Sequence, residues 1–112
     1  MISLPLVEEL RPAPDPLEAC ERLLGLPHLI FLDSAADPER LGRYSYLTAA
    51  PAEVFQSKGV QAGPHALELV RQRLARHARG AVAGLPPFQA GVAGYIGYDW
   101  GAVLERLPSP RY

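Results

Sequence analysis

The sequence predicts an α+β fold, in which two main helices pack on a mostly antiparallel β-sheet. Three observations lead to this fold class. Residues 28–33 form an apolar run without alternation, which is typical of a central strand covered on both faces. Residues 42–49 alternate between apolar and polar side chains, as a strand with one solvated face does. Residues 15–24 and 65–79 repeat apolar side chains at helical spacing, and we interpret them as the two helices.

The first helix has a well-defined start. Asp15 can cap the free amides of the first turn, Pro16 suits the first helical position, and Glu18 completes the capping pattern. Gly25 is expected to end the helix in a left-handed conformation. Cys20 falls on the apolar face, so we expect it to be a small buried hydrophobic residue and not a nucleophile.

Further short strands are expected before the second helix. Residues 2–10 read as a strand interrupted by Pro5, which favours an edge position. Residues 53–56 form another strand, and a turn then leads into a return at residues 60–61. The strand order stays open, because a crossover helix would also allow a parallel pair.

Residues 87–108, PFQAGVAGYIGYDWGAVLERLP, organise the rest of the chain. Their glycines at 91, 94 and 97 lie among small and β-favouring residues, and a glycine within a strand marks a bulge, a bend or a close approach of another backbone. Three of them at this spacing predict a strand that is tightly packed over most of its length. A phosphate-binding loop does not fit, because the GxGxxG spacing is absent and no Lys-Ser/Thr pair follows. Asp99 then opens a short helix, and we interpret it as an N-cap and not as a catalytic acid.

The composition narrows the class of protein. A chain of 112 residues is one domain at most, and its 11 basic and 12 acidic side chains argue against general nucleic-acid binding and against a polybasic membrane anchor. The single cysteine excludes an intramolecular disulfide and fits a cytoplasmic location. No apolar run approaches the roughly 18 residues of a transmembrane helix, and the start does not resemble a signal peptide.

The sequence contains no catalytic constellation. It has no nucleophile elbow, no HExxH, no CxxC and no paired carboxylates at helical spacing, so we expect no catalysis and no metal site in this chain alone. Ser34 follows the predicted central strand, where it could hold a ligand or cap the loop. Arg43 could clamp a carboxylate, or it could form a surface ion pair with Asp37 or Glu39.

Residues 87–99 follow the pattern Pro-Phe-x-x-Gly-x-x-Gly-Tyr-x-x-Tyr-Asp, and residues 105–108 follow the pattern Glu-x-Leu-Pro. Together they resemble the N-terminal region of aminodeoxychorismate synthase component I, also called para-aminobenzoate synthase component I. Anthranilate synthase component I is a relative with a similar segment. Residues 32–34, 42–47 and 50–51 match the same region in the same order. The short N-terminus and Gln89 of the PFQ motif look closer to the aminodeoxychorismate enzyme than to the anthranilate enzyme.

The resemblance implies that residues 1–112 are a truncated N-terminal domain of an α/β-sandwich enzyme that is several times longer. Such an enzyme aminates chorismate at C4, on the way to 4-aminobenzoate and folate, with ammonia from a glutamine amidotransferase subunit. Its catalytic residues and Mg²⁺-binding carboxylates lie in a C-terminal chorismate-binding domain, and no cofactor is implied for this chain. Two alternatives stay open: the same segment of anthranilate synthase component I, or a stand-alone ligand-binding domain that self-associates through an exposed edge.

The resemblance also implies part of a tryptophan pocket shared between the N- and C-terminal parts of the enzyme. The matching positions follow the central strand or lead into the next one; they are Ser34, Leu41, Gly42, Arg43 and Tyr44. This chain alone is expected to bind tryptophan weakly or not at all.

Overall fold

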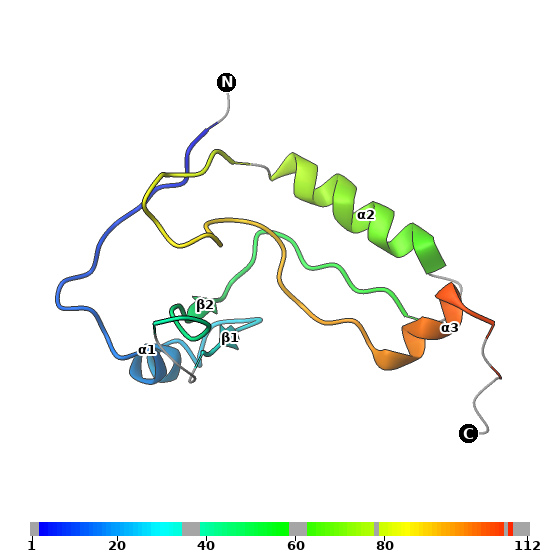
Figure 1. Cartoon of the computed structure of the whole chain (residues 1–112), viewed down its shortest axis with the longest axis horizontal. Coiled ribbons are helices and arrows are strands. Elements are labelled where there is room, and N and C mark those ends of the chain that lie inside the picture. Colours follow the sequence, from blue (N-terminus) through cyan, green and yellow to red (C-terminus); the bar gives the residue numbers. More distant parts are fainter. Residues whose placement is uncertain (1–2, 35–38, 59–62, 78, 107, 109–112) are drawn as a thin grey trace. The chain divides into compact units, whose positions relative to one another are not determined.

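The computed structural model describes residues 3–34, 39–58, 63–77, 79–106 and 108 (Figure 1). The elements are α1 (Pro16–Arg22), β1 (Ile30–Leu32), β2 (Tyr46–Thr48), α2 (Gly63–Arg76), the 3-10 helix η2 (Tyr98–Trp100) and α3 (Gly101–Leu104). The strands β1 and β2 pair in an antiparallel, two-stranded sheet. The predicted α+β class with antiparallel pairing is therefore confirmed.

The chain divides into two compact units. The first comprises Met1–Val54 and Arg79–Ala90, and it contains α1, β1 and β2. The second comprises Phe55–Ala78 and Gly91–Tyr112, and it contains α2, η2 and α3. The boundary at residues 90–91 divides the PFQ motif from the glycines that follow it.

The sheet of the first unit is short and is closed by backbone contacts at one end. Each strand has three residues, with Ile30 opposite Thr48, Phe31 opposite Leu47 and Leu32 opposite Tyr46. Beyond the ladder, the amide of Ala50 donates a hydrogen bond of 2.8 Å to the carbonyl of Pro27. His28 and Ala50 take φ values of 53° and 49°, in a left-handed region that costs a non-glycine residue roughly 1–2 kcal/mol.

Several predicted strands are not formed among the described residues. Residues 3–10, 53–56 and 92–97 have no strand pairing, and the predicted return at 60–61 lies outside the described residues. In the described structure β1 pairs with β2 alone, so it is not a central strand, and none of its three side chains is buried. The prediction was wrong because an apolar pattern shows that a segment suits burial, whereas strand formation also needs a backbone partner within reach.

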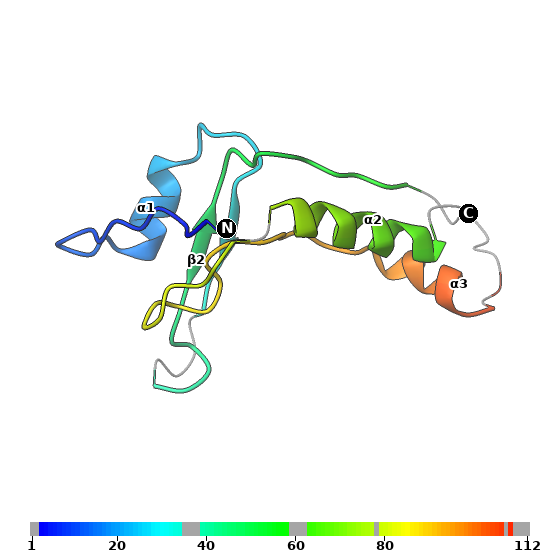
Figure 2. The ribbon, with the colours of Figure 1, turned by 90° about the horizontal axis from the view of Figure 1, so that it is seen from above.

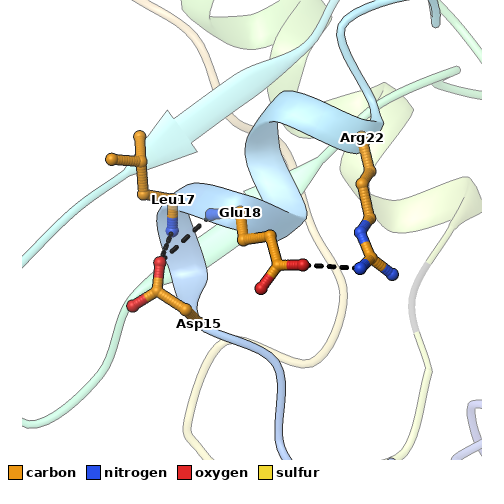
Figure 3. A network of polar contacts seen from close by, with 4 residues as sticks. All are labelled: Asp15, Leu17, Glu18 and Arg22. Carbon is orange, nitrogen blue, oxygen red and sulfur yellow. Dashed lines mark hydrogen bonds and ion pairs between the residues drawn. The ribbon is translucent and has the colours of Figure 1, made fainter.

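The start of α1 agrees with the prediction (Figure 3). One carboxylate oxygen of Asp15 accepts hydrogen bonds from the amides of Leu17 (3.0 Å) and Glu18 (3.1 Å). One turn further on, Arg22 forms an ion pair with Glu18. The Asp15 side chain gives a hydrogen-bond partner to two amides of the first turn that have none within the helix. This seven-residue helix therefore begins where the sequence predicts.

The end of α1 differs from the prediction. The helix stops at Arg22, and its C-cap is Leu23, with φ −98°. The amide of Leu23 donates to the carbonyl of Cys20 (3.0 Å), which tightens the last turn. Gly25 follows two residues later without a positive φ, so its predicted role as a left-handed cap was wrong. Cys20 is a free thiol that is only half-buried.

The helix α2 carries a network of charged side chains. Arg71 donates two hydrogen bonds to the Glu68 carboxylate, from Nε at 2.8 Å and Nη2 at 2.6 Å, and Gln72 donates a third at 3.1 Å. The hydrogen bonds from Arg71, and then that from Gln72, lower the pKa of Glu68 to about 2, while the same contact raises the pKa of Arg71. This network stabilises the carboxylate form of Glu68 in the middle of the helix.

A second contact of α2 was not indicated by the sequence. The guanidinium of Arg73 lies 4.5 Å from the ring centroid of Phe55, a cation–π distance. Arg73 therefore packs on an aromatic ring. The helix ends at Arg76, and Ala78, predicted to extend its apolar stripe, lies outside the described residues.

The C-terminal helices pack against α2 within the second unit, where α2 and α3 lie side by side (Figure 2). Asp99 lies inside η2, whose N-cap is Gly97, and α3 follows with Trp100 as its N-cap; neither cap has a side-chain hydrogen bond. The predicted N-cap role of Asp99 was therefore wrong. The chain enters the 3-10 turn before Asp99, whereas an N-cap side chain needs a residue with extended backbone at the helix start.

The described residues contain no fully buried side chain, either apolar or polar. Leu6, Leu41, Tyr95 and Tyr98 are each more than 90% exposed, at 100%, 91%, 94% and 98% respectively. No helix in the described part is both long and apolar enough to cross a membrane.

We expect the Glu68 carboxyl to titrate near pH 2 instead of its ordinary 4.5. A depressed folded-state pKa means that the contact stabilises α2 fully above the unfolded-state pKa of about 4.3, and that this stabilisation is lost as the pH falls through the folded-state value. Helicity of α2 should therefore stay constant from neutral pH to about 5 and then fall towards pH 2. Carboxyl-carbon NMR measures the titration residue by residue.

The control compares two arginines of the same helix. Arg71→Gln should return the Glu68 pKa towards 4.5, whereas Arg76→Gln should leave it depressed. Equal Glu68 pKa values in the two variants would contradict the assignment of the shift to Arg71.

Candidate functional site

A small polar cluster lies where β1 ends and the approach to β2 begins. The hydroxyl of Ser45 donates to a carboxylate oxygen of Asp33 at 2.9 Å and accepts a hydrogen bond from the amide of Ser34 at 3.3 Å. Leu32 is opposite Tyr46 in the ladder, so the residues just beyond this pair remain neighbours after the strand pairing stops. Ser45 thereby holds the backbone at Ser34 in place.

Aromatic rings extend from this cluster along the first unit. The Arg43 guanidinium lies 5.1 Å from the centroid of the Tyr44 ring. The ring centroids of Tyr44 and Tyr46 are 6.3 Å apart and the rings are tilted by 53°. The Tyr46 and Phe88 rings pack edge to face, with centroids 5.5 Å apart and an angle of 80° between the ring planes. These separations suit aromatic and cation–π pairs, so the strand and the loop that carries Phe88 are joined through their side chains.

Gln89 positions the loop that carries Phe88. Its side-chain oxygen accepts from the amide of Val82 at 2.8 Å, and its side-chain nitrogen donates to the carbonyl of Val82 at 2.9 Å. A primary amide side chain can make both bonds because it offers a donor and an acceptor side by side, as a peptide group does. The glutamine of the PFQ motif therefore closes the loop between residues 82 and 89.

The structure places the five predicted tryptophan-site residues in one part of the first unit. Ser34, Gly42 and Tyr44 are half-buried, whereas Arg43 is exposed and Leu41 is 91% exposed. Ser45 links Ser34 to the segment that holds Arg43 and Tyr44. The described residues leave the Leu41 side chain uncovered, and tryptophan binding by these five residues stays a prediction.

Two functional features were missed by the sequence reasoning. Ser45 was treated as part of an alternating strand, although the antiparallel register could have placed it beside residues 33–34. Arg43 was weighed as a carboxylate clamp or an ion-pair partner, and its contact with Tyr44 is a third role. The possible partner Asp37 lies outside the described residues.

The described residues do not form a metal centre. Among them, no three His, Cys, Asp or Glu side chains lie close enough together to hold a metal ion. The residues of this chain that the structure describes therefore do not fit the Mg²⁺ that the family resemblance implies. That ion would need ligands from elsewhere.

Comparison with known proteins gives weak but extended similarity to one enzyme. Anthranilate synthase component 1 of Streptomyces coelicolor is 35% identical over 94 residues, which cover 83% of this chain and 17% of the relative. The Mycolicibacterium smegmatis protein of the same name is 31% identical over 106 residues, covering 83% of this chain and 20% of the relative. The Cereibacter sphaeroides protein is 31% identical over 93 residues, covering 69% of this chain and 19% of the relative.

This chain is a weak homologue of part of anthranilate synthase component 1. It spans about a fifth of the length of the curated relatives it matches. No protein-family model matches the chain, and no solved structure matches it. The predicted kinship with chorismate-utilising enzymes is thus confirmed at the level of anthranilate synthase component I, whereas the closer assignment to aminodeoxychorismate synthase stays a prediction.

We expect Gln89→Ala to open the loop between residues 82 and 89. The change removes both hydrogen bonds to Val82, and loss of about 1 kcal/mol per bond makes the Val82 amide exchange at least about fivefold faster. The nuclear Overhauser contact between Tyr46 and Phe88 should weaken with it. Amide hydrogen exchange and NMR on the same sample measure both effects.

Gln56→Ala provides the matched control, because Gln56 is exposed and lies outside this loop. In this variant the amide of Val82 should exchange hydrogen at the same rate as in the unaltered chain. If Gln89→Ala also left Val82 unchanged, the amide pairing would not be what closes the loop.

Proposed function

We propose that this chain is the N-terminal segment of aminodeoxychorismate synthase component I, which converts chorismate to 4-amino-4-deoxychorismate for 4-aminobenzoate and folate biosynthesis. The observation that carries the proposal is the similarity to anthranilate synthase component 1 over 83% of the chain. Of the two related enzymes, Gln89 of the PFQ motif favours the aminodeoxychorismate enzyme, because that enzyme is the one that the motif resembles more closely.

In this proposal the chain itself is non-catalytic. Its described residues offer no group of potential metal ligands, and the polar cluster around Ser45 is small, linking two serines to the Asp33 carboxylate. The catalytic residues and the carboxylates that bind Mg²⁺ then belong to a C-terminal chorismate-binding domain. Ammonia comes from a glutamine amidotransferase subunit, replaces the C4 hydroxyl of chorismate, and water leaves. A cytoplasmic location remains part of the proposal.

Anthranilate synthase component I is the second candidate. It is favoured by the names of the three relatives, all of which are anthranilate synthase component 1. The two enzymes share chorismate and an ammonia source, and they differ in the product that they release. A stand-alone ligand-binding domain is the third candidate, and it differs from both in having no aminating activity.

The polypeptide isolated from its source should be several-fold heavier than 12.2 kDa and should aminate chorismate when supplied with Mg²⁺ and ammonium. We expect 4-amino-4-deoxychorismate as the product, identified by liquid chromatography and mass spectrometry. Chelation of the metal should abolish the reaction, because the proposed chemistry depends on Mg²⁺.

Each other outcome selects a different candidate. Anthranilate as the product would select anthranilate synthase, and a native polypeptide of 12.2 kDa without activity would select the stand-alone domain.

We expect Ser34→Ala to weaken the binding of L-tryptophan to the full-length protein. Ser34 is half-buried at the end of β1, and its amide is held by Ser45, so its hydroxyl would face a ligand from a fixed position. Loss of one hydrogen bond of about 1 kcal/mol weakens affinity about fivefold, which isothermal calorimetry resolves. Ser57→Ala, at an exposed position, is the control. Equal affinity for all three proteins would remove Ser34 from the site.

A further inference from the structure

The segment that follows the PFQ motif, residues 91–98, is apolar and exposed. It has the sequence GVAGYIGY and contains no charged side chain. Tyr95 and Tyr98 are 94% and 98% exposed, and Ile96 is 63% exposed. In Figure 1 the segment is an extended tube that leads into the C-terminal helices. With Val92, the eight residues carry four large apolar or aromatic side chains, which is unusual for a surface loop.

The backbone of this segment is also unpaired among the described residues. None of the amides of residues 92–97 donates a hydrogen bond to a described residue, and Trp100 alone donates to this stretch, at the Gly97 carbonyl (3.1 Å). Gly97 is extended, with φ −63° and ψ 145°. An extended backbone with a row of free donors and acceptors is what a strand edge needs in order to pair.

Among the described residues nothing explains the glycines at 94 and 97, whereas Gly91 has a positive φ of 151° that favours glycine. A Cβ atom on Gly94 or Gly97 would meet nothing within 4 Å, and neither residue has a positive φ. Glycine in an extended segment loses more entropy on folding than alanine and contributes no side-chain packing. Their presence is therefore explained by something that approaches the backbone closely and is not among the described residues.

The alternation of side chains along the segment predicts that both of its faces are buried in the folded protein. In an extended chain Val92 and Ile96 share one face with Gly94 between them, and Ala93 and Tyr95 share the other. Apolar residues on both faces are typical of a strand buried within a sheet. Pairing with a second copy of the same segment would satisfy one edge and leave both faces exposed.

We propose that residues 91–98 are a β-strand of a sheet whose other members belong to the remainder of the longer polypeptide. This inference rests on the proposed function, in which the chain is a segment of a longer protein; the chain spans about a fifth of the length of its relatives. The partner is a β-strand whose backbone pairs with residues 92–97 and whose neighbouring elements pack against Gly94 and Gly97. The strand that the sequence predicts at residues 91–98 thus forms only when the remainder of the longer polypeptide is present.

Hydrogen exchange, read residue by residue, tests the inference on the full-length polypeptide and on the 112-residue chain. Amides 92–97 should exchange about 100-fold more slowly in the full-length protein, because strand pairing protects them, and at nearly unprotected rates in the short chain. Unprotected exchange in a full-length protein that aminates chorismate would overturn this inference alone. Absence of any longer polypeptide would overturn the proposed function as well. Protection that rises with concentration in the short chain would identify a second copy as the partner and overturn the inference too.

Gly94→Ala and Gly25→Ala form a matched pair, because each glycine has open space around a built Cβ and no positive φ. In the full-length protein we expect Gly94→Ala to speed exchange of amides 92–97 at least about tenfold, since the added methyl group would meet the partner. Gly25→Ala should leave these rates unchanged. Equal rates in the two variants would contradict a close partner at Gly94, and the exchange pattern of the unaltered protein decides the question if the variant does not fold.

Discussion

The pairing of β1 with β2 is the interaction on which the first unit depends. It places Asp33 and Ser34 beside Ser45, and it presents Tyr46 to Phe88. Because the ladder is only three residues long, side chains extend the contact beyond its Leu32–Tyr46 end, and a backbone hydrogen bond from Ala50 to Pro27 extends it beyond the other. The polar cluster extends from one end, and the aromatic rings connect the strand to the loop that Gln89 closes. The candidate ligand site is therefore a consequence of the strand register.

The residues of the pattern at 87–98 fall into two groups according to their contacts. Phe88 and Gln89 act within this chain, through the Tyr46 ring and the backbone of Val82. Gly94 and Gly97 have no neighbour in the described part of the chain that would require a glycine. The start of the motif thus closes a loop within this chain, whereas its later part is the segment proposed to pair with a partner outside the described residues.

The exposed apolar surface and the comparisons lead to the same interpretation by separate routes. The described residues bury no side chain completely, although nearly half of the sequence, 48%, is hydrophobic. The relatives are several-fold longer proteins of which this chain matches about a fifth. A segment that evolved to lie within a larger sheet would keep its apolar pattern while lacking, by itself, the surfaces that cover it. The chemistry of such a protein would then reside in the part that this chain supports.

The sequence by itself determined the local features: the Asp15 cap, the two helical segments, the antiparallel class and the kinship with anthranilate synthase component I. These depend on neighbouring residues or on an extended pattern. Only the tertiary structure decided that Gln89 pairs with Val82, that Arg73 lies over Phe55 and that Ser45 joins Asp33 to Ser34. The predicted strand at residues 92–97 did not form in this chain for the same physical reason. Local preference selects an extended backbone, but hydrogen bonding and burial depend on partners that lie far away in sequence.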